Sequence, residues 1–142
     1  MNYYINALKN YAVFTGRARR SEYWYFVLFN FVFAMAAAIL DNMLHITISL
    51  APGYPGFYGY IYFAYALFAL IPGLAVLIRR LHDIGKSGWF FLIVFIPIIG
   101  AIWLLVLLFK ESQPGENKYG PNPKGIGNYD EVDKVGEHLQ AQ

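Results

Sequence analysis

The chain has 142 residues, of which 58% are hydrophobic and 14% are charged, and its formal net charge is +2. Soluble domains contain roughly 45 to 50% apolar and about 25% charged residues, so this composition excludes an ordinary soluble domain and is typical of a membrane protein. The sequence contains no cysteine, which excludes disulfides and thiol chemistry.

Residues 1–22 form a polar leader that is rich in aromatic and basic residues. Tyr4, Leu8 and Tyr11 recur at helical spacing, which predicts a short helix lying in the lipid headgroup region. A leader without fixed structure is the alternative. The basic residues of this segment are Lys9, Arg17, Arg19 and Arg20. The apolar run that follows is too long for a signal peptide and lacks a cleavage pattern, so we expect it to remain as a membrane anchor.

Three apolar runs without charged residues cover residues 23–40, 57–78 and 89–109. A helix of about 20 apolar residues crosses the hydrocarbon core of a bilayer, so each run is a predicted membrane span. We therefore predict an all-α, multi-pass transmembrane protein with three spans. Asn30 is a strongly polar side chain deep within the first span, and we expect it to form a hydrogen bond to a neighbouring helix.

The third run contains Pro97 and Gly100 near its middle. A kinked helix is the preferred interpretation, because neighbouring helices satisfy the backbone group that proline frees. A re-entrant hairpin is the alternative. The basic leader and the basic loop 79–88 both belong on the cytoplasmic side, whereas the loop 41–56 has no lysine or arginine and belongs outside. Three full spans would place the C-terminal tail outside, and a hairpin would return it to the cytoplasm.

The loop after the second run reads RRLHDIGKSGW. Its GKS triplet at 85–87 matches the end of a nucleotide-binding phosphate loop, but Arg80 occupies the position of the required first glycine and no strand precedes the triplet. We therefore interpret this segment as a charged hinge. Arg79 and Asp83, four residues apart, are predicted to pair on one helical face. Ser87 is predicted to cap the start of the third span through its hydroxyl.

The search for chemistry finds no motif for a metal site or a nucleophile, because the three histidines lie in separate segments and no recognised catalytic spacing occurs. We expect no enzyme activity, no cofactor and no nucleic-acid partner. The remaining candidates form a basic cytoplasmic face that is predicted to bind anionic lipid headgroups or a protein partner. Its residues are Arg17, Arg19, Arg20, Arg79, Arg80, His82, Asp83 and Lys86.

Two alternatives remain open, one for the role of this face and one for the function of the protein. In the first alternative, the face has only a structural role, as a basic turn whose arginines extend their charged ends to the membrane surface. The alternative function is a small transporter or channel subunit that forms its pathway only as a homo-oligomer.

Three segments carry a family resemblance. They read FTGRARRSEYWYF at 14–26, RRLHDIGKSGW at 79–89 and PGENKYGPNP at 114–123. In this order they resemble the bacterial inner-membrane proteins grouped as domain of unknown function 805. The resemblance covers residues 1–124 and implies a small integral inner-membrane protein, with no reaction or substrate attached. Residues 125–142 are predicted to be a polar, disordered extension beyond this domain.

Overall fold

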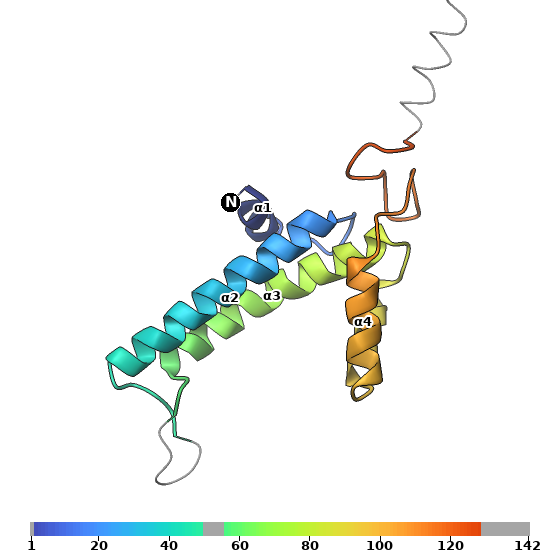
Figure 1. Ribbon diagram of the computed structural model, residues 1–142. Helices are drawn as coiled ribbons and strands as arrows, with labels where there is room; N and C mark the ends of the chain where they lie inside the picture. The colour runs from blue at the N-terminus through green and yellow to red at the C-terminus, as the bar shows by residue number, and fades with distance from the viewer. Residues whose placement is uncertain (1, 50–55, 129–142) are drawn as a thin grey trace, which may run out of the picture.

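Two long antiparallel helices, α2 (Arg20–Met43) and α3 (Tyr60–Asp83), form the centre of the computed structural model, which describes residues 2–49 and 56–128 (Figure 1). Each helix has 24 residues and is therefore about 36 Å long, which exceeds the roughly 30 Å of a bilayer core. By length and composition both are able to cross a membrane. The predicted all-α class is confirmed, since the described residues form only helices, turns and two isolated bridges.

Small side chains allow α2 and α3 to approach closely. Ala38 and Ala69 are buried between the helices, and a Cβ added at Gly73 would lie 3.6 Å from the ring of Phe26 on α2. The Tyr65 hydroxyl on α3 donates a hydrogen bond of 2.7 Å to the side-chain oxygen of Asn30 on α2. The predicted interhelical role of Asn30 is therefore confirmed.

The far end of this helix pair is closed by Asp41, which lies in the last turn of α2 and is fully buried. Its carboxylate accepts hydrogen bonds from the backbone N–H groups of Gly59 (3.0 Å), Ile61 (3.0 Å) and Tyr62 (2.9 Å) at the start of α3. A carboxylate at this position satisfies the unpaired N–H groups of a helix start and complements the positive end of its dipole. Asp41 thus joins the two helices after the loop that separates them.

The third apolar run folds as a hairpin of two short helices, where we expected one kinked helix. The 3₁₀ helix η1 (Gly88–Phe95) is followed by a turn and then by α4 (Ile99–Phe109). A Cβ at Gly100 would lie 1.7 Å from the carbonyl oxygen of Ile93, so the close return of the chain requires glycine there. Each arm is only about 16 Å long at the rises of the two helix types.

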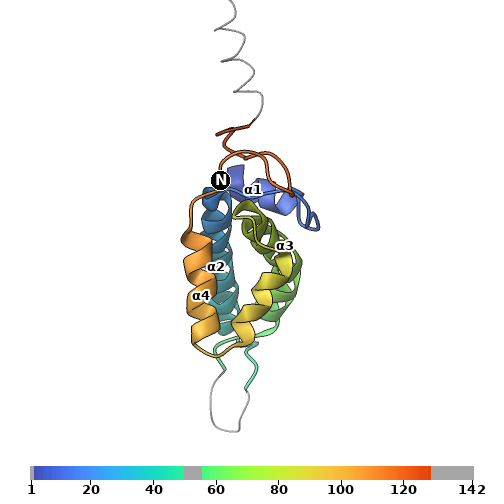
Figure 2. The same ribbon diagram turned by 90° about the vertical axis from the view of Figure 1, so that its right-hand side faces the viewer.

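Both ends of this hairpin lie beside the C-terminal end of α3 (Figures 1 and 2). The backbone N–H of Gln113 donates a hydrogen bond of 3.0 Å to the carbonyl of Asp83, which ends α3. The tail therefore returns to the end of the molecule from which the hairpin starts, as the alternative interpretation of the third run requires.

The leader forms the predicted short helix, α1 (Asn2–Lys9), which lies across α2 near the start of that helix (Figure 2). Of the three residues on which the prediction rested, Tyr4 and Leu8 lie in α1, whereas Tyr11 follows its end and is exposed. Tyr4 and Leu8 pack with Phe26 and Val76, and the Tyr4 ring stacks on Phe26 with 5.6 Å between the centroids. The apolar face of α1 is thus used for packing against the long helices. Residues 129–142, most of the predicted polar extension, lie outside the described residues.

Candidate functional site

Three segments that are far apart in the sequence meet where α2 begins and α3 ends (Figure 1). They are residues 14–20 of the leader, residues 79–88 of the hinge and residues 110–128 of the tail, which we call the polar cap. The Ala18 N–H donates a hydrogen bond of 3.0 Å to the carbonyl of Arg79, and the Gln113 N–H donates one of the same length to that of Asp83. The polar cap contains all three segments that carry the family resemblance, at least in part.

Asp83 is the centre of the polar cap. Its fully buried carboxylate accepts a hydrogen bond of 3.0 Å from Arg17 Nε, one of 2.5 Å from Ser112 Oγ and a further one from Arg80 Nη1. The exposed fractions of the Arg17 and Arg80 side chains are 1% and 0%. One carboxylate of the hinge is therefore joined to the leader and to Arg80 by buried ion pairs and to the tail by the hydrogen bond from Ser112.

The two guanidinium groups also satisfy backbone carbonyls. Arg17 donates to the carbonyls of Gly115 (2.7 Å), Gly120 (3.3 Å) and Asp83 (3.2 Å). Arg80 donates to the carbonyls of Leu108 (3.3 Å) and Lys110 at the end of α4. A cation at a helix C-terminus satisfies carbonyls that lack an intrahelical partner and complements the negative end of the dipole. Arg80 thereby fixes the returning arm of the hairpin to α3.

The predicted pair between Arg79 and Asp83 is wrong. Arg79 Nη1 instead lies 2.9 Å from Glu22 Oε1 on α2, and only 6% of the Arg79 side chain is exposed. The reason is that Arg79 faces α2, whereas Arg80 and Asp83, three residues apart, face the leader and the tail. The Nε and Nη2 groups of Arg79 find no acceptor within residues 2–49 and 56–128.

His82 forms a second junction of the same three segments. Its Nδ1 lies 3.2 Å from the carbonyl oxygen of Gly16 in the leader, and its ring stacks on Tyr119 of the tail with 3.7 Å between centroids. The Asn117 side chain donates a hydrogen bond of 3.0 Å to the His82 carbonyl. The carboxylate of the neighbouring Asp83 is engaged by Arg17 and Arg80, so the ring of His82 serves to join the leader and the tail to the hinge.

The remaining predicted residues lie at the rim of the polar cap. Arg19 donates a hydrogen bond of 2.8 Å to the carbonyl of Pro123, and Arg20 lies 3.0 Å from Glu111, a pair whose side chains are 41% and 70% exposed. Lys86 is exposed and lies over the ring of Phe90, 5.4 Å from its centroid. The predicted cap by Ser87 is wrong, because its side chain makes no capping hydrogen bond at the start of η1.

The tail supplies the half of the site that the residue-by-residue prediction missed. Ser112, Gln113, Asn117 and Tyr119 all contact the hinge directly. The third resemblance segment, PGENKYGPNP at 114–123, was the available signal for Asn117 and Tyr119, whereas Ser112 and Gln113 precede it. Three full spans would place the tail on the opposite side of the membrane from the hinge, so a contact between the two was not predicted.

The described part of the chain offers no metal site, since no group of three or more His, Asp and Glu side chains is arranged to hold an ion there. The buried charges of the polar cap are paired with one another or with backbone carbonyls. Such an arrangement holds segments together, and it does not by itself provide a nucleophile or an acid–base pair.

The sequence is similar to those of known proteins. Residues 11–121 match the family described as "Protein of unknown function (DUF805)". The chain is similar to the inner membrane protein YhaH of Escherichia coli strain K12, with 41% identity over 128 residues that cover 87% of this chain and 98% of that protein. It is also similar to the inner membrane protein YhaI of the same strain, with 42% identity over 124 residues that cover 87% and 97%. No solved structure matches the chain.

Proposed function

Because this chain belongs to the DUF805 family and is a multi-pass inner-membrane protein, we propose that it is a non-enzymatic membrane module whose basic cytoplasmic face binds anionic lipid headgroups. The face is the polar cap. Its cytoplasmic position follows from the retention of lysine and arginine on that side of the membrane.

The observation that carries the proposal is that the basic residues fall into a buried group and an exposed group. The side chains of Arg17, Arg79 and Arg80 are at most 6% exposed, and each forms a buried or nearly buried ion pair. In contrast, Lys86 and Lys118 are exposed and form no ion pair with any described residue. We therefore assign assembly of the cap to the inner arginines and headgroup contact to the rim.

The rim suits anionic lipid for reasons of position and charge. It lies where α2 begins and α3 ends, which is the boundary between the hydrocarbon core and water. Each lysine or arginine near an anionic membrane surface contributes about 1 kcal/mol of attraction. The exposed basic residues of the rim are Lys86, Lys110, Lys118 and Lys124, with Arg20 partly exposed beside Glu111.

The test is lipid retention by the full-length protein, measured by native mass spectrometry after extraction in a mild detergent with equal amounts of phosphatidylglycerol and phosphatidylethanolamine. We expect the wild type to retain phosphatidylglycerol preferentially. The triple variant Lys86→Gln, Lys118→Gln, Lys124→Gln should lose this preference. Three charges at about 1 kcal/mol each correspond to an upper limit on the order of 100-fold.

The matched control replaces the same three lysines by arginine. It keeps the charges and should keep the preference for phosphatidylglycerol. If the glutamine variant retains the two lipids in the wild-type ratio, binding of anionic headgroups by these lysines is refuted. A protein partner is then the remaining ligand for this face. Substitution of Arg79 or Arg80 is unsuitable for this test, because both are buried and their loss would disturb the cap itself.

A further inference from the structure

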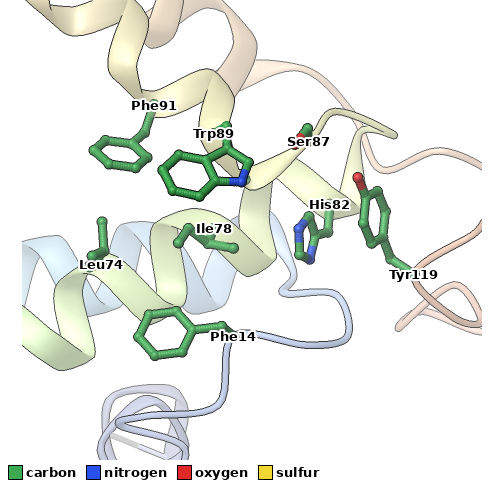
Figure 3. A pocket seen from close by; sticks show the side chains of 9 residues that line it. Phe14, Leu74, Ile78, His82, Ser87, Trp89, Phe91 and Tyr119 are labelled. Atoms are coloured by element: carbon green, nitrogen blue, oxygen red, sulfur yellow. The ribbon is translucent and has the colours of Figure 1, made fainter.

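A cleft of about 430 Å³ lies beside the polar cap, between α3, the start of η1 and the leader (Figure 3). Pockets that bind small molecules have volumes of roughly 300 to 1,000 Å³ and are mostly apolar with a few polar groups. This cleft has that character, since its lining combines aromatic and aliphatic side chains with His82, Ser87 and Tyr119. Two of its lining residues, His82 and Tyr119, also take part in the contacts that build the cap.

The floor of the cleft runs along α3. Leu74, Ile78 and His82 follow one another at intervals of four residues, which places them on one face of the helix over about 12 Å. Figure 3 shows Phe14 of the leader on one side of this floor and Trp89 of η1 on the other. Because α3 crosses the membrane, a cleft along it points from the headgroup level into the hydrocarbon region.

The two ends of the cleft differ in polarity. Figure 3 shows Leu74 and Phe91 at one end, and Ser87, His82 and Tyr119 at the other. A Cβ at Gly88 would lie 2.7 Å from Ile78 Cγ2, so glycine allows η1 to begin directly against the floor at the polar end. The apolar end therefore lies deeper along α3 and the polar end lies at the cap.

Two lysines are neighbours of residues that line the polar end, and the Nζ of one of them, Lys86, lies over the ring of Phe90. Lys86 directly precedes Ser87, and Lys118 Nζ lies 4.9 Å from the centroid of the Tyr119 ring. Neither lysine is paired with a carboxylate in the described part of the chain, and the Ser87 hydroxyl makes no hydrogen bond there. Two ammonium groups and a hydroxyl are suitable donors for a phosphate group.

We propose that this cleft binds one anionic phospholipid, with an acyl chain along Leu74 and Ile78 and the phosphate group between Lys86, Ser87 and Lys118. The occupant is an amphiphile because the cleft is apolar at one end and polar at the other, where its lining residues Ser87 and Tyr119 are next to Lys86 and Lys118 in the sequence. A membrane lipid fits because the apolar end lies along α3, a helix long and apolar enough to cross the bilayer. This inference rests on the proposed function and gives it a defined site in place of a diffuse charged surface.

The experiment uses tryptophan fluorescence in vesicles that contain lipids with brominated acyl chains, which quench a tryptophan on contact. The sequence has three tryptophans. The double variant Trp24→Phe, Trp103→Phe leaves Trp89 in the wall of the cleft as the reporter. The double variant Trp24→Phe, Trp89→Phe leaves Trp103, which is 56% exposed on α4, as a matched reporter for bulk lipid.

We expect brominated phosphatidylglycerol to half-quench Trp89 at a mole fraction several-fold lower than brominated phosphatidylcholine does. Trp103 should respond equally to the two lipids. In the Trp89 reporter, Lys86→Gln with Lys118→Gln should bring the two quenching curves together, and the corresponding arginine variant should keep them apart. If the reporter variants fail to assemble, the difference in quenching between the wild type and Trp89→Phe gives the same comparison.

Three results would contradict the proposal, and they distinguish failure of the cleft as a lipid site from failure of the proposed function. Absence of quenching at Trp89 by either lipid overturns the cleft as an acyl-chain site. Equal quenching by the two lipids, with lipid retention in detergent still selective for phosphatidylglycerol, overturns the cleft but leaves the proposed function. Equal quenching together with unselective retention overturns both.

Discussion

The carboxylate of Asp83 provides the sharpest test of how the polar cap is held together. Asp83→Asn keeps the shape of the side chain but removes the negative charge that faces Arg17 and Arg80. All three side chains are at most 1% exposed, so the two guanidinium groups would be left buried without a counter-charge. Loss of one partner from a buried ion pair costs about 3 to 5 kcal/mol. Since both arginines share this carboxylate, the two losses do not add, and we expect a single penalty in that range.

Glu111→Gln is the matched control for this substitution. Glu111 also lies between two cations, Arg20 at 3.0 Å and Lys124 at 3.4 Å. The hydrogen bond and charge of Lys124 lower the pKa of the Glu111 carboxyl, with a smaller contribution from Arg20. The side chain is nevertheless 70% exposed, and exposed ion pairs are weakened by water and salt. The same chemical change should therefore leave the stability of the protein almost unaltered.

The assay is reversible unfolding by sodium dodecyl sulfate from a mild detergent, followed by tryptophan fluorescence. We expect Asp83→Asn to lower the free energy of unfolding by about 3 to 5 kcal/mol, and Glu111→Gln to match the wild type. Equal effects of the two substitutions would refute the reasoning, because burial is the difference between the two sites.

Three further predictions concern other parts of the fold. Because the hinge and the tail meet at one end, Lys86→Cys and Lys118→Cys should react with a membrane-impermeant thiol reagent only after cells are permeabilised; reaction at position 118 alone in intact cells would contradict the hairpin. Asp41→Ala removes the three hydrogen bonds that cap α3 and should cost about 1 to 2 kcal/mol in the same unfolding assay. A loss below half of that would show that water or another side chain replaces the cap. Tyr65→Phe leaves Asn30 without its 2.7 Å partner and should cost about 0.6 to 1.7 kcal/mol, whereas an unchanged midpoint would mean that Asn30 finds another donor.

The sequence by itself determined the features that depend on local composition. Long uncharged runs with few turn residues have to bury their backbone polar groups inside a helix when they lie in lipid, so α2 and α3 were predictable from their apolar content alone. The polarity of Asn30 inside such a run required a partner on another helix, and Tyr65 is that partner. The leader helix followed from the spacing of its apolar side chains.

Only the tertiary structure decided which partners the charged residues take. Spacing along α3 allowed Arg79 to pair with Asp83, but the position of α2 draws Arg79 to Glu22 and leaves Asp83 to Arg80 and to Arg17, which is 66 residues away. Spacing within one helix cannot predict this, because it contains no information about which neighbour covers which face. For the same reason, the sequence did not predict which basic residues are buried in the cap and which are exposed at its rim.

The path of the third apolar run was also decided by tertiary contacts. Pro97 and Gly100 are compatible with a kinked span and with a hairpin, and local preferences do not distinguish the two. The hairpin is held by contacts at its ends, where Arg80 binds the last carbonyls of α4 and the tail is hydrogen-bonded to Asp83. Those contacts join segments that are distant in sequence, and they bring leader, hinge and tail onto one surface.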